Sequence, residues 1–225
     1  MSKLEGYDFV FLDFDGLLVN TEHLHYQAYQ KMCQDRGCLL SWDFPTYCQI
    51  AHASSEGIRE RIYQDFPVLL KNEPDWAVLY AEKKAAYEGF LEEGKVELMP
   101  AVAEFLLYLQ HHNIQSCVVT NSFNKQTEAI KGQIPELRAI PYWVTREEYL
   151  KAKPSPDPYL AAKEKYAQGK KRTIGFEDTV RGWQSLAQAN IDAVVISSCL
   201  SDDFKRYLEE KGVSYFPSFN EFLSS

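Results

Sequence analysis

Four short apolar runs, each leading directly into polar residues, constrain the fold of this chain more than any other feature of its sequence. They occupy residues 9–12, 116–120, 173–176 and 193–196. Runs of this kind are typical of strands buried on both faces of a parallel sheet. Helical patterns separate them, as the apolar spacing of residues 102–109 illustrates. The alternation predicts an α/β fold with a doubly wound, Rossmann-like parallel sheet, in which ligands bind beyond the carboxyl ends of the strands.

The stretch from about residue 21 to residue 95 interrupts this alternation. Helical patterns cover residues 22–36, 55–65 and 74–90, and no convincing strand lies among them. We interpret the stretch as a helical cap domain inserted after the first strand. The expected boundaries are 1–19 and 96–225 for the α/β core domain and 20–95 for the helical cap domain.

Composition and charge limit the classes of partner that the chain can bind. Hydrophobic residues make up 45% of the 225 residues, enough for a substantial core. The net charge of −8 argues against nucleic acid or an anionic membrane as the main partner, because both require a basic surface. No apolar run approaches the roughly 20 residues needed to cross a bilayer. A small anionic substrate remains compatible, since a metal ion and one lysine can reverse the local field.

Cysteine usage and the N-terminus indicate a compartment. The chain has five cysteines, an odd number, without a Cys-x-x-Cys pair that could begin a zinc site. Residues 1–8 are too short and too polar for a signal peptide. We therefore expect a cytoplasmic protein.

Two aspartates follow the first apolar run. Asp13 and Asp15 are two positions apart, so on a strand their side chains share a face. Two carboxylates at such a short distance repel each other unless a cation or a proton lies between them. A hard ion such as Mg²⁺ prefers oxygen clusters of this kind. Gly16 allows a sharp turn immediately afterwards. The alternative is a pair of solvated aspartates that cap a loop.

A second acidic pair, Glu177 and Asp178, follows the run at 173–176. In a parallel sheet both pairs meet at one edge, and four converging carboxylates require a cation. The alternative is an N-cap, in which Asp178 and Thr179 simply begin the helix that contains Trp183.

Two further features favour a phosphate ligand. Thr120, Asn121 and Ser122 end a third run, where hydroxyl, amide and backbone N–H groups at a strand-to-helix turn suit a phosphate. Lys153 precedes a proline-rich, stiff loop, where its charge could neutralise a phosphoryl oxygen. Taken alone, each feature has a simpler explanation that would be preferred: an ordinary helix cap for the residues at 120–122, and a surface lysine for Lys153.

In combination, the four motifs resemble those of the haloacid dehalogenase superfamily. That family carries Asp-x-Asp-Gly, then Thr or Ser at a strand end, then Lys-Pro, then Glu-Asp or Asp-Asp. The matching residues here are Asp13-Phe14-Asp15-Gly16, Thr120-Asn121, Lys153-Pro154 and Glu177-Asp178. The resemblance spans nearly the whole chain. The cap is inserted at a position similar to that in one branch of the family, which contains β-phosphoglucomutase and many sugar-phosphate and phosphoglycolate phosphatases.

The resemblance implies a role for each motif. Asp13 would attack phosphorus as the nucleophile, and Asp15 would act as general acid and base. Mg²⁺ would be the cofactor, bound by Asp13, the main-chain carbonyl of Asp15 and Asp178, with Glu177 a ligand directly or through water. Thr120 and Lys153 complete the implied catalytic set and, with Asn121, would hold the phosphoryl oxygens. The family dehalogenases lack an acid/base aspartate at the position of Asp15, so its presence favours phosphoryl transfer.

The cap should determine specificity. By the resemblance, His25 matches a cap-side histidine of this branch, and His52 stands where β-phosphoglucomutase has a glycine in its cap loop. Ser55 replaces the arginine that holds the far phosphate in that enzyme. This departure favours a phosphatase over a mutase. The predicted substrate-binding residues are Asn121, Gly16, His25 and His52.

The leading prediction is a hydrolase: a Mg²⁺-dependent phosphatase that acts on a small-molecule phosphate ester, such as a sugar phosphate, through an aspartyl-phosphate. A phosphosugar mutase and a non-catalytic binding protein on the same fold are the alternatives. We expect no nucleic-acid or membrane partner, and a monomer or weak homodimer.

Overall fold

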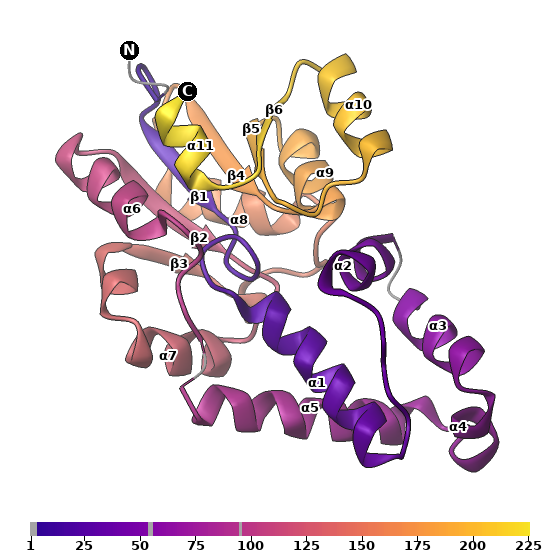
Figure 1. The fold of residues 1–225 in the computed structure, drawn as a ribbon. Helices are drawn as coiled ribbons and strands as arrows, with labels where there is room; N and C mark the ends of the chain where they lie inside the picture. The colour runs from indigo at the N-terminus through magenta and orange to yellow at the C-terminus, as the bar shows by residue number, and fades with distance from the viewer. Residues whose placement is uncertain (1–3, 54–55, 95) are drawn as a thin grey trace. The chain divides into compact units, whose positions relative to one another are not determined.

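The computed structural model describes residues 4–53, 56–94 and 96–225 (Figure 1). The chain divides into two compact units, one formed by Met1–Asn20 with Glu97–Ser225 and the other by Thr21–Val96. None of the described helices combines the length and the apolar character that a membrane-spanning helix requires.

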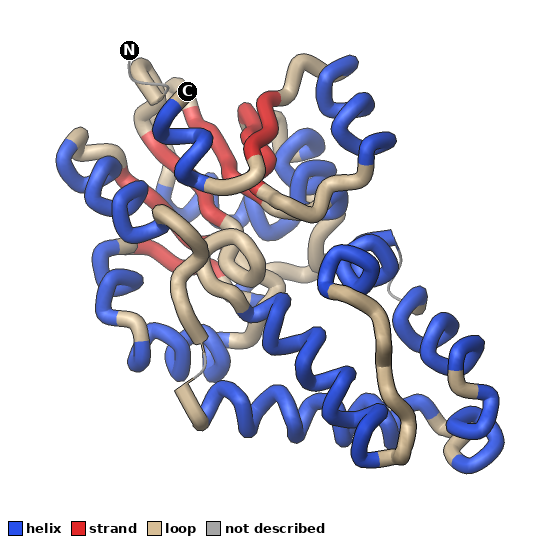
Figure 2. The backbone as a smooth tube through the Cα atoms, in the orientation of Figure 1, coloured by secondary structure: helices blue, strands red, loops and turns tan. Residues whose placement is uncertain are grey.

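The first unit is built on a six-stranded parallel sheet, whose strands are red in Figure 2, in the order β3-β2-β1-β4-β5-β6 that the labels of Figure 1 allow the reader to follow. This order confirms the predicted doubly wound α/β fold. The strands are β1 (Phe9–Leu12), β2 (Gln115–Val119), β3 (Tyr142–Val144), β4 (Thr173–Glu177), β5 (Asp192–Ile196) and β6 (Ser214–Phe216). The helices are α6 (Val102–His111), α7 (Asn124–Gln133), α8 (Asp157–Tyr166), α9 (Val180–Gln188), α10 (Asp202–Glu210) and α11 (Phe219–Ser224), with 3-10 helices η1 (Pro135–Ala139) and η2 (Arg146–Glu148).

Two strands fall outside the apolar runs of the sequence. β3 and β6 are the edge strands of the sheet, and each is only three residues long. Val144 is buried and Ser214 is exposed, while their other residues are only partly buried. A short, half-exposed edge strand carries little of the continuous apolar signal that marks a central parallel strand, so the sequence did not predict them.

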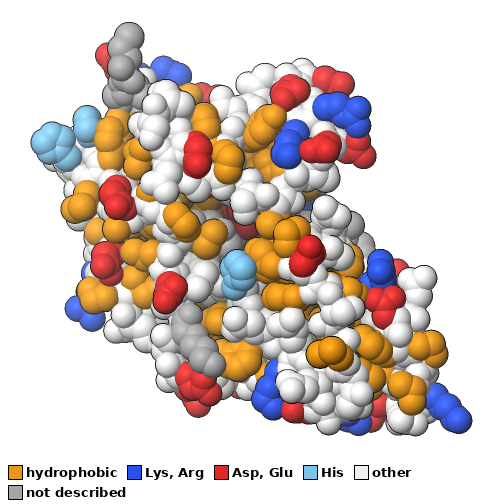
Figure 3. Space-filling view, in the orientation of Figure 1, with side chains coloured by type: hydrophobic (Ala, Val, Ile, Leu, Met, Phe, Trp, Pro, Cys, Tyr) orange, Lys and Arg blue, Asp and Glu red, His pale blue; other side chains and the backbone are white. Residues whose placement is uncertain are grey.

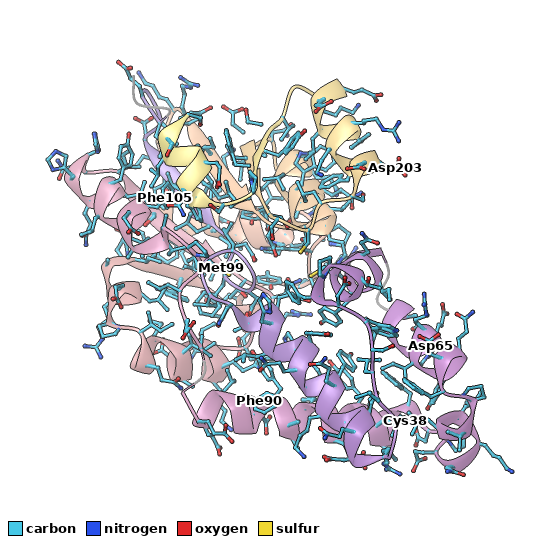
Figure 4. The ribbon with its side chains drawn as sticks, viewed as in Figure 1. Cys38, Asp65, Phe90, Met99, Phe105 and Asp203 are labelled. Carbon is cyan, nitrogen blue, oxygen red and sulfur yellow. The ribbon has the colours of Figure 1, made fainter. Side chains whose placement is uncertain are left out.

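The side chains of successive residues in the central strand β1 lie on opposite faces of the sheet. Phe9 and Phe11 belong to a buried cluster that includes residues of α8 and α9, among them Tyr159 and Leu186. A second aromatic group forms around Phe105 of α6 (Figure 4), whose ring lies 5.1 Å from that of Phe176, 4.4 Å from Phe219 and 5.9 Å from Phe222. Both faces of the sheet are therefore covered, which fixes the strands that carry the candidate site.

The second unit is helical. It contains α1 (Thr21–Asp35), α2 (Phe44–Ala53), α3 (Gly57–Asp65), α4 (Pro67–Asn72) and α5 (Trp76–Glu92). No strand occurs in its described residues, 21–53, 56–94 and 96. Aromatic rings hold it together, as between Tyr29 of α1 and Trp76 of α5 at 6.4 Å. Trp42 Nε1 donates a hydrogen bond to Asp65 Oδ2 at 2.8 Å, which connects the loop after α1 to the end of α3.

Charged side chains are scattered over the face shown in Figure 3, and some of them are paired locally. On α10, Asp202 pairs with Lys205 at 3.1 Å, and Asp203 pairs with Arg206. Such exposed pairs contribute little stability.

We predict that Gly175→Ala destabilises the protein by about 1–3 kcal/mol, because the added methyl group overpacks the core. A Cβ at this position of β4 would lie 2.2 Å from Leu186 Cδ2, and Leu186 is fully buried. Urea unfolding measures the effect. The control is Gly132→Ala on α7, where a Cβ meets nothing within 4 Å. Equal stability of the two variants would contradict the packing argument.

Candidate active site

Three neighbouring strands deliver polar residues to one edge of the sheet. Leu12, the last residue of β1, is in register with Val118 of β2 and Phe176 of β4. The next residue, Asp13, donates its backbone N–H to the Phe176 carbonyl at 3.0 Å. Because parallel strands end at the same edge, the residues that follow these strands converge there.

Lys153 is the electrostatic centre of this edge. Its side chain is buried, and Nζ donates to Asp13 Oδ1 at 2.5 Å, to Glu177 Oε1 at 2.6 Å and to the Val119 carbonyl at 2.7 Å. These three bonds use all three donors of the ammonium group. Burial opposes its charge, but Asp13 and Glu177 outweigh burial and raise the pKa of Lys153 above its ordinary value. Lys153 is therefore not one of the solvated surface lysines.

Asp13 is buried beside this cation. Burial raises the pKa of its carboxyl group to about 8, and Lys153 opposes that rise, while Glu177 and Asp15 add to it. A carboxylate in this position depends on nearby positive charge to remain ionised.

Asp15 is held by hydroxyl groups of the β2 end. Its Oδ2 accepts hydrogen bonds from Ser122 Oγ at 2.6 Å and from Thr120 Oγ1 at 3.1 Å. The sequence did not give Ser122 a role of its own. Its place two residues after Thr120, in the same turn, is the signal that could have identified it.

Gly16 forms the turn that the sequence predicted. Its φ of 82° lies in the left-handed region, and its N–H donates to the Val19 carbonyl at 2.9 Å. The predicted contact of Gly16 with substrate stays a prediction.

Asn121 connects two loops of the edge. Its side-chain oxygen accepts from the Tyr149 hydroxyl at 2.9 Å and from the backbone N–H of Lys153 at 3.2 Å. The Tyr149 hydroxyl also lies 2.7 Å from the Thr120 carbonyl. Tyr149 had no motif to mark it in the sequence, and its phenol joins the β2 turn to the loop that carries Lys153.

Tyr159 is a further residue that the sequence analysis missed. It lies on α8, is fully buried, and donates its hydroxyl to Glu177 Oε1. Burial raises the pKa of this phenol well above its usual value, with the charge of Glu177 adding to the rise, so the group acts as a donor. In sequence it is indistinguishable from any aromatic residue of a core helix.

The donor set fits a divalent metal ion. Asp13, Glu177 and Asp178 are all buried, and each offers a carboxylate oxygen within 4.8 Å of the others. Hard oxygen ligands of this kind suit Mg²⁺, and carboxylates buried together need a positive charge. Asp15 is not part of this group, and the predicted contribution of its main-chain carbonyl stays a prediction.

The predicted residues of the helical unit can be described only in part. His25 of α1 is half-buried; its Nδ1 lies 2.6 Å from Nζ of Lys83 on α5, and its ring stacks on Tyr87 at 4.1 Å. Burial lowers the pKa of His25 well below its ordinary value and that of Lys83 to about 8. The side chain of His52, on α2, and the whole of Ser55 lie outside the described residues.

Comparison with known proteins places the chain among relatives of similar length. A family model described as haloacid dehalogenase-like hydrolase matches residues 10–196. The phosphorylated carbohydrates phosphatase of Thermotoga maritima is 25% identical over 212 residues, covering 91% of this chain and 92% of that protein. Protein CbbY of Cereibacter sphaeroides is 24% identical over 192 residues, covering 83% of this chain and 82% of that protein.

Solved structures share the fold. The crystal structure of a HAD hydrolase of family IA, variant 3, from Entamoeba histolytica aligns with a TM-score of 0.70 and 24% identity, covering 95% of this chain and 94% of that chain. At this identity the similarity concerns the fold alone.

We predict that Lys153→Met lowers the free energy of unfolding by about 3–5 kcal/mol at neutral pH without added metal, because it leaves buried carboxylates without their partner. The control is Lys165→Met. Lys165 pairs with Glu148 at 2.7 Å, but 54% of its side chain is exposed, so the loss should stay below about 1 kcal/mol. Urea unfolding of both variants checks the prediction, and equal losses would contradict it.

Proposed function

The chain belongs to the haloacid dehalogenase-like hydrolases, and from that premise we propose that it is a Mg²⁺-dependent phosphomonoesterase acting on a small phosphorylated metabolite through an aspartyl-phosphate. The observation that carries the proposal is the contact between Lys153 Nζ and Asp13 Oδ1 within a group of buried carboxylates. A nucleophilic carboxylate beside a fixed cation and a metal-binding group suits attack on a phosphate ester.

Asp13 is the proposed nucleophile. One of its carboxylate oxygens forms a bond to phosphorus while the bond between phosphorus and the leaving oxygen breaks. Asp15, protonated at this stage, transfers its proton to that leaving oxygen. Water then attacks the phosphorus of the aspartyl-phosphate and gives a proton to Asp15, which releases inorganic phosphate and restores Asp13.

Other residues of the edge position these groups. Lys153 stabilises the charge on Asp13 and on the phosphoryl oxygens that approach it, and the side-chain amide of Asn121 in the turn after β2 offers them hydrogen-bond donors. Thr120 and Ser122 fix Asp15 through its Oδ2 atom. Because these contacts are formed before substrate arrives, little reorganisation is required during the reaction.

The proposed ligands of Mg²⁺ are Asp13, Asp178 and the main-chain carbonyl of Asp15, with Glu177 bound directly or through water. When bound, the ion supplies neutralising charge for the phosphoryl group. Calorimetry that detects no Mg²⁺ binding to the wild-type protein would contradict this assignment.

A phosphorylated carbohydrate is the proposed substrate class. The relative from Thermotoga maritima, which covers nearly the whole chain, is described as a phosphorylated carbohydrates phosphatase. We assign substrate selection to the helical unit acting as a cap, with His25 and His52 as contacts and Gly16 and Asn121 as contacts from the core. A substrate complex in which both histidines lie apart from the ligand would overturn that assignment.

We predict that Asp13→Asn abolishes Mg²⁺-dependent release of phosphate from sugar phosphates and from an aryl phosphate, because the amide is not a nucleophile. Phosphate release is the measurement, with EDTA as a second control. Asp192→Asn, an exposed aspartate at the start of β5, should retain activity.

Two outcomes would count against the proposal. One is turnover by Asp13→Asn equal to that of the wild type. The other is conversion of a hexose 1-phosphate to the 6-phosphate without release of inorganic phosphate, which would identify a mutase.

A further inference from the structure

The hydroxyl group of Tyr159 is a polar group within an apolar core. The residue is 0% exposed and belongs to an apolar cluster with Phe11, Ala162 and Leu186. Its ring meets that of Phe11 edge-on at 6.0 Å. Phenylalanine would make the same packing contacts without the cost of burying a polar group. The hydroxyl therefore requires an explanation other than packing.

The partner of this hydroxyl is the Glu177 carboxylate, which is confined on two sides. Its Oε1 accepts from both Tyr159 and Lys153. Its Oε2 lies against Gly182 at the start of α9, where a Cβ would stand only 1.8 Å away. The absence of a side chain at Gly182 makes room for the carboxylate, and Tyr159 holds it from the other side.

The position of Glu177 in turn fixes Lys153. All three donors of Nζ are used, by Asp13, Glu177 and the Val119 carbonyl. The ring of Tyr159 also lies 4.9 Å from Nζ, within the range of a cation–π contact. A shift of the Glu177 carboxylate would thus move the ammonium group away from Asp13.

We propose that Tyr159 is a positioning residue of the phosphoryl-transfer site, which acts by holding Glu177 as the fixed counter-ion of Lys153. The inference rests on the proposed function. It assigns Glu177 primarily to Lys153, and it gives Gly182 the task of admitting the carboxylate. In this role Tyr159 acts through its hydrogen bond to Glu177 and makes no contact of its own with the phosphoryl group.

The test compares Tyr159→Phe with the wild-type protein. The variant keeps the ring and removes only the hydroxyl. We expect kcat to fall about tenfold, the loss that corresponds to one hydrogen bond, while KM and the Kd for Mg²⁺ from calorimetry stay within about twofold. The matched control is Tyr166→Phe on the same helix. The ring of Tyr166 stacks on that of Tyr142 at 4.5 Å, and this variant should keep the wild-type kcat.

A double-mutant cycle with Glu177→Gln tests whether Tyr159 affects kcat through Glu177. If Tyr159 acts through Glu177, adding Tyr159→Phe to Glu177→Gln should change kcat by less than about twofold. The shifts in urea midpoint of the metal-free proteins should likewise be non-additive, which tests the contact without reference to activity.

Three results would overturn the inference: an unchanged kcat in Tyr159→Phe, additive effects in the cycle, or a loss of Mg²⁺ affinity that accounts for the loss of kcat. A wild-type protein that hydrolyses no phosphate ester would instead overturn the proposed function. In that case the metal-free cycle still decides whether Tyr159 and Glu177 are coupled.

Discussion

The buried ammonium group of Lys153 is the interaction on which the candidate site depends. It joins Asp13 after β1, the last carbonyl of β2 and Glu177 at the end of β4, so one cation links three adjacent strands. Burying such a group is costly, and the cost is offset only because every one of its donors has a partner. The same arrangement holds the positive charge of Lys153 beside Asp13, where it would stabilise a phosphoryl group that approaches this carboxylate.

The parallel sheet makes this convergence possible. Residues that are more than one hundred positions apart in the chain, such as Asp13 and Lys153, meet because β1, β2 and β4 are in register and end at one edge. Further contacts hold the residues that surround the reacting groups in place. Tyr159 supports Glu177, and Tyr149 joins Asn121 to the loop of Lys153, so the reacting groups stand on residues that are themselves fixed.

The sequence predicted the central strands and their polar ends, because continuous apolar runs and acidic pairs are local signals. It missed β3 and β6, whose short edge segments carry no such signal, and it could not separate Lys153 from other lysines by pattern alone. The resemblance to a family made that distinction. Tyr159 and Tyr149 were beyond reach, since a tyrosine with a structural hydroxyl and one that only packs look alike in sequence. The contacts of His52 lie outside the described residues, so its role remains a prediction.

The central claim is that Asp13 carries the phosphoryl group during turnover. The most direct test is rapid acid quenching of the wild-type protein with a radiolabelled phosphate ester and Mg²⁺, followed by mapping of the labelled peptide. We predict a label on the peptide that contains Asp13, which hydroxylamine removes as it does other acyl phosphates. Turnover with the label on a different residue, or with direct transfer to water and no labelled protein at any time point, would contradict the account.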